Sequence, residues 1–398
     1  MRTRPQRIAI YCQDGLGLGH LRRNSLIGAH LLKQCPDSSI LLFTDSPVAP
    51  FFRLAPGMDH VKLPSFMKVR PGEWQAVRLP LAALDMQRLR IGLLERGLQE
   101  YEPDLLLVDH MPQGAHGELI GPLRALRHAR PQCQIVLGLR DVLDAPELTR
   151  RVWRGEGAHE ALAQFYDQIL VYGCRELFDT AAVYALPMPA GQIQFCGYVV
   201  NREVQQTAES VRARVGVQDR KLVLVAAGGG HDGRLLIQTY LESLRVLGDR
   251  VDFATLVTLG ANAPAQDCSE LAQLAQGLPV QIVNSLDDSL SHMGAADLMV
   301  CMGGYNTLAE VLFLQKKAIV IPRAGPSAEQ RIRARLFAER DLIDMIDPDK
   351  LTPALLAERI VLDLARNDFP RASPQLSMQG SECAAEALVQ ILGTNVYA

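Results

Sequence analysis

The sequence predicts an α/β protein made of two doubly wound domains that face a central cleft. Three observations support this fold class. Short apolar runs alternate with amphipathic helical patterns along the whole chain. A glycine turn follows a strand pattern near the start of each half, at 15–19 and again at 228–230. The length of 398 residues exceeds what a single hydrophobic core usually organises.

The apolar runs give the expected strands in order. They lie at 7–12, 39–44, 104–108, 134–139, 168–172 and 193–196 in the first half, and at 221–226, 254–259, 280–283, 298–301 and 317–322 in the second. Their alternation with helices is typical of parallel sheets covered on both faces. The polar segment 196–220 interrupts this pattern. We therefore expect an N-terminal domain over 1–200, a linker over 201–220, a C-terminal domain over 221–375 and a last helix within 376–398.

The composition bounds the class of protein. A net charge of −3 gives no general attraction to nucleic acid, and 48% hydrophobic residues is ordinary for a globular chain. Eight cysteines without a C-x-x-C pair indicate a reducing compartment. The N-terminus lacks a signal-peptide core, and no apolar stretch is long enough to span a bilayer. We expect a cytoplasmic protein, either soluble or peripheral on the inner face of the cell membrane.

The second half contains two turns that suit phosphate oxygens. KLVLVAAGGGHDG at 221–233 and DLMVCMGGYNTLAEVLFLQ at 297–315 each place glycines between a strand and a helix. Backbone N–H groups at a helix start carry partial positive charge and lack intrahelical partners. Two such turns suggest a diphosphate ligand, with Gly229, Gly230, Gly303, Gly304, Asn306 and Thr307 as its candidate contacts.

The first half opens with a related phosphate-type turn in RIAIYCQDGLGLGHLRRN, where Gly17, Gly19 and His20 precede a helical pattern. Gly17 and Gly19 are its candidate contacts with the nucleotide. The dinucleotide fingerprint requires a third glycine where His20 stands. Asp45, after the second strand, could still bind a ribose, so a nicotinamide-dependent enzyme remains an alternative.

His20 is the first candidate for catalysis. A helix start disfavours an imidazolium, so the neutral ring can remove a proton from an acceptor hydroxyl or from water. The alternatives are that His20 positions phosphate or acceptor, or only caps the turn. Asp109, which with His110 ends the strand pattern DLLLVDH, is a second candidate base or acceptor contact, as is the pair Arg140 and Asp141.

Four segments together resemble the GT-B glycosyltransferases. They are the turn at 15–20, the turn at 228–230, GGYNTLAE at 303–310 and EQRIRARLF at 329–337. Within that superfamily they are similar to the family that adds N-acetylglucosamine to the lipid-linked peptidoglycan precursor. The resemblance implies two Rossmann-like domains, of which the C-terminal one binds a nucleotide-sugar, with UDP as the expected nucleotide. It also implies that the final helix crosses back to the first domain.

The resemblance assigns roles to four further residues. Glu310 would bind the ribose hydroxyls, although Thr307–Glu310 also fits a capping box. Glu329 and Gln330 would contact the donor sugar, although Ser327–Gln330 is a second capping-box pattern. The family usually has His-Gln or Gln-Gln there, so Glu329 leaves the donor sugar open. Leu286, in the loop 283–289, would meet the nucleobase through its main chain.

The resemblance also implies a reaction without metal or other cofactor. The only D-x-D, at 347–349, contains Pro348 and is expected to form a turn, and no His/Cys cluster has ligand spacing. The expected activity is transfer from a nucleotide-sugar to a sugar, lipid-linked or small-molecule acceptor hydroxyl, with inversion. The main alternative is hydrolysis of a nucleotide-sugar, as in the hydrolase of the pseudaminic acid pathway. A non-catalytic sensor and an epimerase are further alternatives.

The segment 51–90 mixes large apolar residues with seven basic and three acidic ones. An acceptor loop or an anionic membrane surface would suit this composition. An ordinary surface loop followed by a helix fits it equally well.

Overall fold

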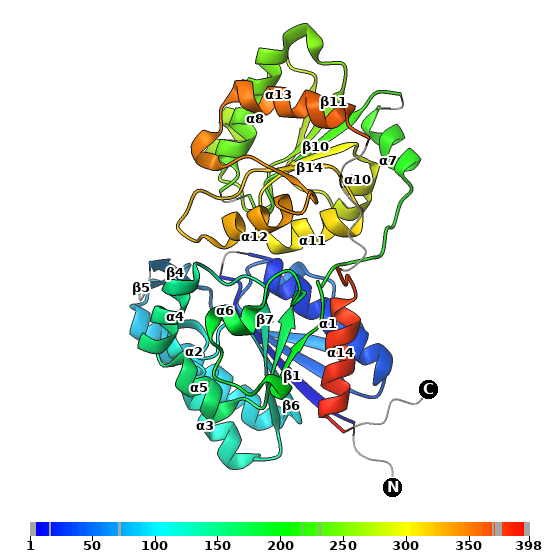
Figure 1. The fold of residues 1–398 in the computed structure, drawn as a ribbon. Helices are drawn as coiled ribbons and strands as arrows, with labels where there is room; N and C mark the ends of the chain where they lie inside the picture. The colour runs from blue at the N-terminus through cyan, green and yellow to red at the C-terminus, as the bar shows by residue number, and fades with distance from the viewer. Residues whose placement is uncertain are drawn as a thin grey trace. The chain divides into compact units, whose positions relative to one another are not determined.

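The computed structural model describes residues 5–15, 17–70, 73–217, 219–230, 232–367, 370 and 376–393. The chain forms two compact units, one of Met1–Val199 with Leu376–Ala398 and the other of Val200–Gln375 (Figure 1). Each unit has its own parallel sheet and its own apolar core. The predicted doubly wound α/β class is confirmed for both units.

The first unit contains a seven-stranded parallel sheet in the order β3-β2-β1-β6-β7-β8-β9. Its strands are β1 (Arg7–Cys12), β2 (Ser39–Thr44), β3 (Met58–Lys62), β6 (Leu105–Asp109), β7 (Gln134–Arg140), β8 (Gln168–Tyr172) and β9 (Ile193–Phe195). Its helices are α1 (Gly19–Gln34), α2 (Ala83–Tyr101), α3 (Ile120–Ala129), α4 (Pro146–Gly155), α5 (Ala158–Phe165), α6 (Thr180–Tyr184) and α14 (Gly380–Ile391). In Figure 1, α1 and α14 lie on one side of the sheet and α2, α3 and α5 on the other.

The central strands of this sheet are almost entirely apolar because helices cover both of their faces. The last helix, α14, packs along α1 and buries Ala384, Ala385 and Leu388. Its first residue, Gly380, lies so close to the backbone at Tyr198 that a Cβ atom would come within 2.5 Å of the Tyr198 carbonyl carbon. The C-terminal helix is thus an integral part of the first unit.

The segment 51–90 contains more regular secondary structure than the surface loop and helix expected from the sequence. Besides β3 it contains the antiparallel hairpin of β4 (Phe66–Arg70) and β5 (Glu73–Ala76), and then the start of α2. Phe66, Trp74 and Met86 form a small separate apolar cluster beneath the hairpin. The hairpin could not be predicted, because only a few of its side chains face that cluster and apolar and polar residues therefore alternate weakly along it.

The second unit contains a six-stranded parallel sheet in the order β12-β11-β10-β13-β14-β15. Its strands are β10 (Leu222–Ala226), β11 (Ala254–Thr258), β12 (Val280–Val283), β13 (Leu298–Cys301), β14 (Ala318–Val320) and β15 (Asp344–Met345). Its helices are α7 (Ala208–Val215), α8 (Arg234–Leu247), α9 (Ala265–Leu274), α10 (Ser289–Ala295), α11 (Tyr305–Phe313), α12 (Glu329–Ala338) and α13 (Pro353–Ala365).

The segment 201–220, expected to be a linker, contains α7. Thr207 caps this helix by accepting a hydrogen bond from the Ser210 N–H at 3.3 Å. The helix packs against α10, buries Val211, and pairs Arg212 with Asp297 at 3.1 Å. The polar segment is therefore not a free linker but a helix of the second unit that packs on α10.

Both sheets reverse their strand order at one point. The reversal lies between β1 and β6 in the first unit and between β10 and β13 in the second. In doubly wound sheets the loops at the carboxyl ends of these two strands diverge and leave room for a ligand. The turns after β1 and β6, and those after β10 and β13, are therefore the places to look for function.

Candidate active site

His20 and Asp109 meet at the strand reversal of the first unit. Asp109 is the last residue of β6, and His20 is the second residue of α1, directly after the turn that follows β1. His20 Nδ1 lies 2.7 Å from Asp109 Oδ2. Arg23 Nη2 lies 2.9 Å from the same ring nitrogen, but a carboxylate at 2.7 Å requires a proton on Nδ1. Nε2 is then the basic atom of a ring whose side chain is 18% exposed.

Asp109 is held as an anion. Burial raises the pKa of this carboxyl group, but the charges of Arg23 and His20 and their hydrogen bonds outweigh burial, so the pKa lies below its usual range. Arg23 Nη2 donates to both carboxylate oxygens, at 2.9 and 2.8 Å, and Asn24 Nδ2 donates at 2.9 Å. A buried carboxylate fixed in this way orients the imidazole of His20 and stabilises its protonated form.

His110 adds a second imidazole at this place. Its backbone adopts φ 72°, which is unusual for a residue other than glycine, and its ring centre lies 5.5 Å from that of His20. Burial, followed by the charge of Arg140, holds the pKa of His110 well below its usual range, so this ring is neutral. Its buried Nδ1 has no hydrogen-bond partner within the described residues.

The glycine turn after β1 already contains a carboxyl group that accepts hydrogen bonds from its own backbone, and burial raises the pKa of this group. Asp14 Oδ2 accepts the Leu21 N–H at 2.6 Å, and the Asp14 carbonyl accepts the Gly17 N–H. A Cβ atom on Gly17 would lie 2.9 Å from Asp14 Oδ1. The start of α1 is therefore capped internally, and the turn serves to fix His20. Phosphate contact by Gly17 and Gly19 stays a prediction, and this cap weighs against it.

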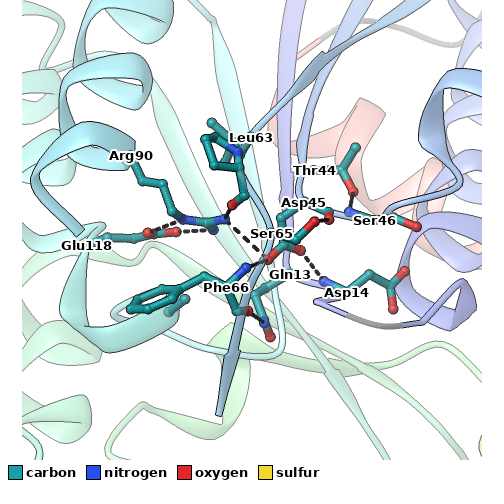
Figure 2. Close-up of polar contacts among 12 residues, drawn as sticks. Gln13, Asp14, Thr44, Asp45, Ser46, Leu63, Ser65, Phe66, Arg90 and Glu118 are labelled. Atoms are coloured by element: carbon teal, nitrogen blue, oxygen red, sulfur yellow. Dashed lines mark hydrogen bonds and ion pairs between the residues drawn. The ribbon is translucent and has the colours of Figure 1, made fainter. Parts of the chain in front are cut away.

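Asp45 does not have the ribose-binding role that the nicotinamide alternative requires. It is completely buried after β2, where its Oδ1 accepts the Asp14 N–H at 2.6 Å and its Oδ2 accepts Arg90 Nη1 at 3.2 Å (Figure 2). Arg90 also donates to both oxygens of Glu118, at 2.6 and 2.7 Å. Both carboxylate oxygens of Asp45 are buried and already accept hydrogen bonds within the protein, so they are not available to a ribose. The ribose-binding expectation for Asp45 was wrong.

In the second unit, the four candidate glycines divide into two kinds. A Cβ atom on Gly230 would lie 2.6 Å from the Leu259 carbonyl oxygen, and one on Gly303 would lie 2.9 Å from the Gln330 carbonyl oxygen. These two glycines are needed by the packing of the protein itself. Gly304 has φ −65° and nothing within 4 Å of its Cβ position, and Gly229 has only Asn262 Nδ2 at 4.0 Å. Their lack of a side chain leaves the backbone open to a ligand.

The helices that follow these turns begin without a side-chain cap. The N-cap residues are Gly233 for α8 and Gly304 for α11, and neither helix has an acidic residue in its first turn. Their strands, β10 and β13, are neighbours at the strand reversal. Two helix starts that lie close together suit the two phosphates of a nucleoside diphosphate.

Glu310 lies deeper in α11 than the capping-box alternative requires. The helix begins at Tyr305, so Thr307 is its third residue and cannot be its N-cap, and this alternative is wrong. Glu310 is buried on the same helical face as Asn306 and Thr307. A buried carboxylate one turn behind an open helix start can accept hydrogen bonds from a ribose diol. Ribose binding by Glu310 stays a prediction.

Glu329 and Gln330 are tied to the turn after β13. Arg333, which is completely buried, pairs with Glu329 at 2.9 Å and donates to the Gly303 carbonyl at 3.3 Å. Gln330 Oε1 accepts the Arg323 N–H at 3.0 Å. Ser327 accepts the N–H of Glu329, not that of Gln330, so the second capping-box alternative is wrong as well. Sugar contact by both residues stays a prediction.

Leu286 is partly buried in the loop between β12 and α10, at the far edge of the sheet from β15. Contact of Leu286 with a nucleobase stays a prediction.

The Asp347–Asp349 segment forms a turn, as predicted, in which Asp347 Oδ1 accepts the Asp349 N–H at 3.1 Å. Within the described ranges, no three His, Cys, Asp or Glu side chains are grouped to hold a metal ion.

Comparison with known proteins finds glycosyltransferases among the relatives of this chain. Residues 222–387 match the model of the glycosyltransferase family 28 C-terminal domain. The UDP-N-acetylglucosamine–N-acetylmuramyl-(pentapeptide) pyrophosphoryl-undecaprenol N-acetylglucosamine transferase of Anaeromyxobacter sp. (strain Fw109-5) is 26% identical over 348 residues, which are 84% of this chain and 85% of that protein. An uncharacterized glycosyltransferase of Methanopyrus kandleri is 25% identical over 180 residues, which are 44% of this chain and 48% of that protein.

Solved structures share the fold. The glycosyltransferase of kitacinnamycin has a TM-score of 0.66 and 19% identity, with 98% of this chain and 100% of that chain covered. MurG of Acinetobacter baumannii has a TM-score of 0.58 and 14% identity, with 98% and 99% covered. The UDP-GlcNAc 2-epimerase of Methanocaldococcus jannaschii has a TM-score of 0.64 and 11% identity, with 97% and 100% covered. One fold thus serves both transfer and epimerisation, and only the site separates them.

The relatives found by sequence carry the names of glycosyltransferases. The family match covers most of the unit that contains the two open helix starts. The chain is a nucleotide-sugar-dependent glycosyltransferase of the GT-B fold, and it resembles the family that adds N-acetylglucosamine to the lipid-linked peptidoglycan precursor.

Proposed function

We propose that this enzyme transfers a sugar from a UDP-linked donor to a hydroxyl group of a glycolipid or other cell-envelope acceptor, with inversion and without a metal ion. The observation that carries the proposal is the 2.7 Å contact between His20 Nδ1 and Asp109 Oδ2 at the strand reversal of the first unit. This contact orients His20 as a base. The proposed substrate class follows from the names of the relatives.

The proposed reaction is a single displacement. His20 Nε2 takes the proton of the acceptor hydroxyl, and Asp109 stabilises the imidazolium that forms. The acceptor oxygen attacks the anomeric carbon of the donor as the bond from that carbon to the diphosphate oxygen breaks. The diphosphate leaves with the bonding electron pair, and the starts of α8 and α11 stabilise its negative charge. One displacement inverts the configuration at the anomeric carbon.

Hydrolysis is the second candidate, because the same residues could activate water. Gly17, Gly19, His20 and Arg23 follow the turn pattern of the pseudaminic acid pathway hydrolase, and the structure brings His20, Arg23 and Asp109 into contact. Incubation of the enzyme with UDP-sugars in the absence of acceptor separates the two. Release of free sugar at catalytic rates would establish hydrolysis, whereas a requirement for acceptor supports transfer.

Nucleotide binding tests the donor half of the proposal. We expect UDP to stabilise the protein more than GDP, ADP, dTDP or CMP. At 100 times its dissociation constant, UDP should raise the free energy of unfolding by about 2.7 kcal/mol relative to the protein without ligand. Glu310→Gln should weaken UDP binding by roughly 10- to 100-fold, because the amide keeps the shape but loses the charge that strengthens hydrogen bonds to the ribose. Thermal unfolding with each nucleotide measures both effects.

Glu242→Gln is the matched control, since Glu242 lies two turns beyond the start of α8 and accepts a hydrogen bond from Gln238. Equal UDP affinity in wild type and Glu310→Gln would exclude the ribose role. No stabilisation by any of the five nucleotides would contradict the proposed function as a whole.

Membrane contact through 51–90 is the proposed route to a lipid-linked acceptor. In the described part of the chain no helix is long and apolar enough to cross a membrane. Six of the thirteen large exposed apolar side chains there belong to this segment: Phe51, Val69, Leu79, Leu81, Leu84 and Leu89. Arg53, Lys68, Arg78 and Arg88 are also exposed in this segment, whereas Arg90 is buried and contributes no surface charge. A surface that is apolar and basic suits an anionic bilayer.

We expect Phe51→Ser combined with Leu84→Ser to lower binding to vesicles that contain an anionic lipid by about 10-fold or more. Phe51 is 90% exposed and Leu84 is 59% exposed, so the folded unit should not change. Co-sedimentation with vesicles measures the effect, and Val246→Ser on α8 serves as the control. Undiminished binding by the double variant would exclude this segment as the membrane contact.

A further inference from the structure

We propose that Arg323 binds the diphosphate of the donor and that Asp232 holds its guanidinium in place until the donor arrives. This inference rests on the proposed function, because it assigns a further residue to the same donor site. Neither residue stands out in the sequence, since Arg323 follows β14 in the stretch Ile-Pro-Arg and Asp232 lies within a glycine-rich turn.

The sequence and the sheet order place this ion pair next to the start of α8 and on either side of the strand that leads to α11. Asp232 belongs to the turn between β10 and α8, and Arg323 follows β14. Arg323 Nη2 lies 2.7 Å from Asp232 Oδ2. Because β13 lies between β10 and β14 in the sheet, the pair joins the loops on either side of the carboxyl end of β13. Residues 302–304, which lead into the start of α11, occupy that end.

The surroundings of Arg323 suit a charged ligand better than a structural ion pair. The side chains of Arg323 and Asp232 are 36% and 38% exposed, and pairs this accessible to water add little to stability. Arg323 Nε is buried and has no hydrogen-bond partner among the described residues. The backbone of Arg323 is fixed, because its N–H donates to Gln330 Oε1 at 3.0 Å. The residue is therefore anchored at its main chain and has donor capacity left at its side chain.

The chemistry of the guanidinium matches a diphosphate. Its planar set of donors can bind two phosphate oxygens at once, which an ammonium group cannot do in the same geometry. A nucleoside diphosphate carries more negative charge than the carboxylate of Asp232, and it would lie beside the positive ends of α8 and α11. The diphosphate should therefore displace Asp232 from Arg323. As the bond to the sugar breaks, the same guanidinium would stabilise the charge that builds up on the leaving diphosphate.

Binding measurements on three proteins test the inference. We expect Arg323→Gln to weaken binding of UDP and of inorganic pyrophosphate by about 10- to 100-fold and to leave uridine binding unchanged. Asp232→Asn is the matched variant, since it breaks the same ion pair but keeps the arginine. Its affinity for UDP should equal or exceed that of the wild type. Isothermal titration of the full chain with UDP, pyrophosphate and uridine measures all three.

The possible outcomes separate this inference from the proposed function. If the wild type binds UDP and Arg323→Gln binds it equally well, Arg323 does not contact the diphosphate. If Arg323→Gln and Asp232→Asn weaken UDP binding to the same extent, the ion pair acts only as a structural link, and the inference is also overturned. If the wild type binds neither UDP nor pyrophosphate, the proposed donor site itself is wrong.

Discussion

His20→Ala should lower kcat by about 10²- to 10⁴-fold, the usual contribution of a general base, and should leave UDP affinity unchanged. The ring belongs to the first unit, whereas the proposed nucleotide contacts belong to the second. Its Nδ1 is directed to Asp109, so its Nε2 is the atom that can accept the acceptor proton. Steady-state kinetics with a UDP-sugar and a soluble acceptor analogue, together with titration of UDP, separate catalysis from binding.

Asp109→Asn tests whether the two residues act as one unit. The amide removes the charge that fixes the Nδ1 proton and that stabilises the imidazolium, so kcat should also fall by orders of magnitude. The double variant should be scarcely slower than either single variant, because each change disables the same base. Since Asp109 also binds Arg23 and Asn24, the unfolding temperature of each variant must be compared with that of the wild type. A His20→Ala variant with at least a third of the wild-type kcat would exclude His20 as the base.

The doubly wound fold could be predicted because its signals are local. Each parallel strand is a short apolar run, and the glycine turns mark where strands end and helices begin. His20 and Asp109 could each be nominated for the same reason, because both lie at expected strand or helix ends. Their contact, however, joins residues 89 positions apart in the chain. Only the strand order, in which β6 lies beside β1, brings them together.

The features that were missed depend on where helices start and on which side chains are buried. Both capping-box predictions were wrong because the N-cap residues of α11 and α12 are Gly304 and Ala328 and not Thr307 and Ser327. Asp14 was overlooked because a carboxylate that caps a helix from beyond the N-cap leaves no standard spacing. Arg90 was counted as a surface charge, since a buried arginine on an amphipathic helix cannot be distinguished from an exposed one without its partners.

Arg90→Met should destabilise the first unit by about 3–5 kcal/mol, the usual result of removing one partner from a buried ion cluster. The substitution leaves Asp45 and Glu118 as buried carboxylates without their shared cation. Tyr11 donates to Glu118 at 2.7 Å but cannot neutralise it. Both tryptophans of the chain, Trp74 and Trp153, belong to the first unit, so denaturant unfolding followed by tryptophan fluorescence reports on this unit alone.

Arg88→Met is the control for lost helix propensity and surface charge, because Arg88 lies on the same helix with its side chain 78% exposed. Its effect should stay within about 0.5 kcal/mol. Arg90→Met should also reduce kcat in the molecules that remain folded, since Asp45 holds the Asp14 N–H and Asp14 caps the helix that carries His20. Equal stability of the two variants would mean that the cluster is not a net stabilising element. Reduced stability with full kcat would mean that the cluster supports the fold without positioning the base.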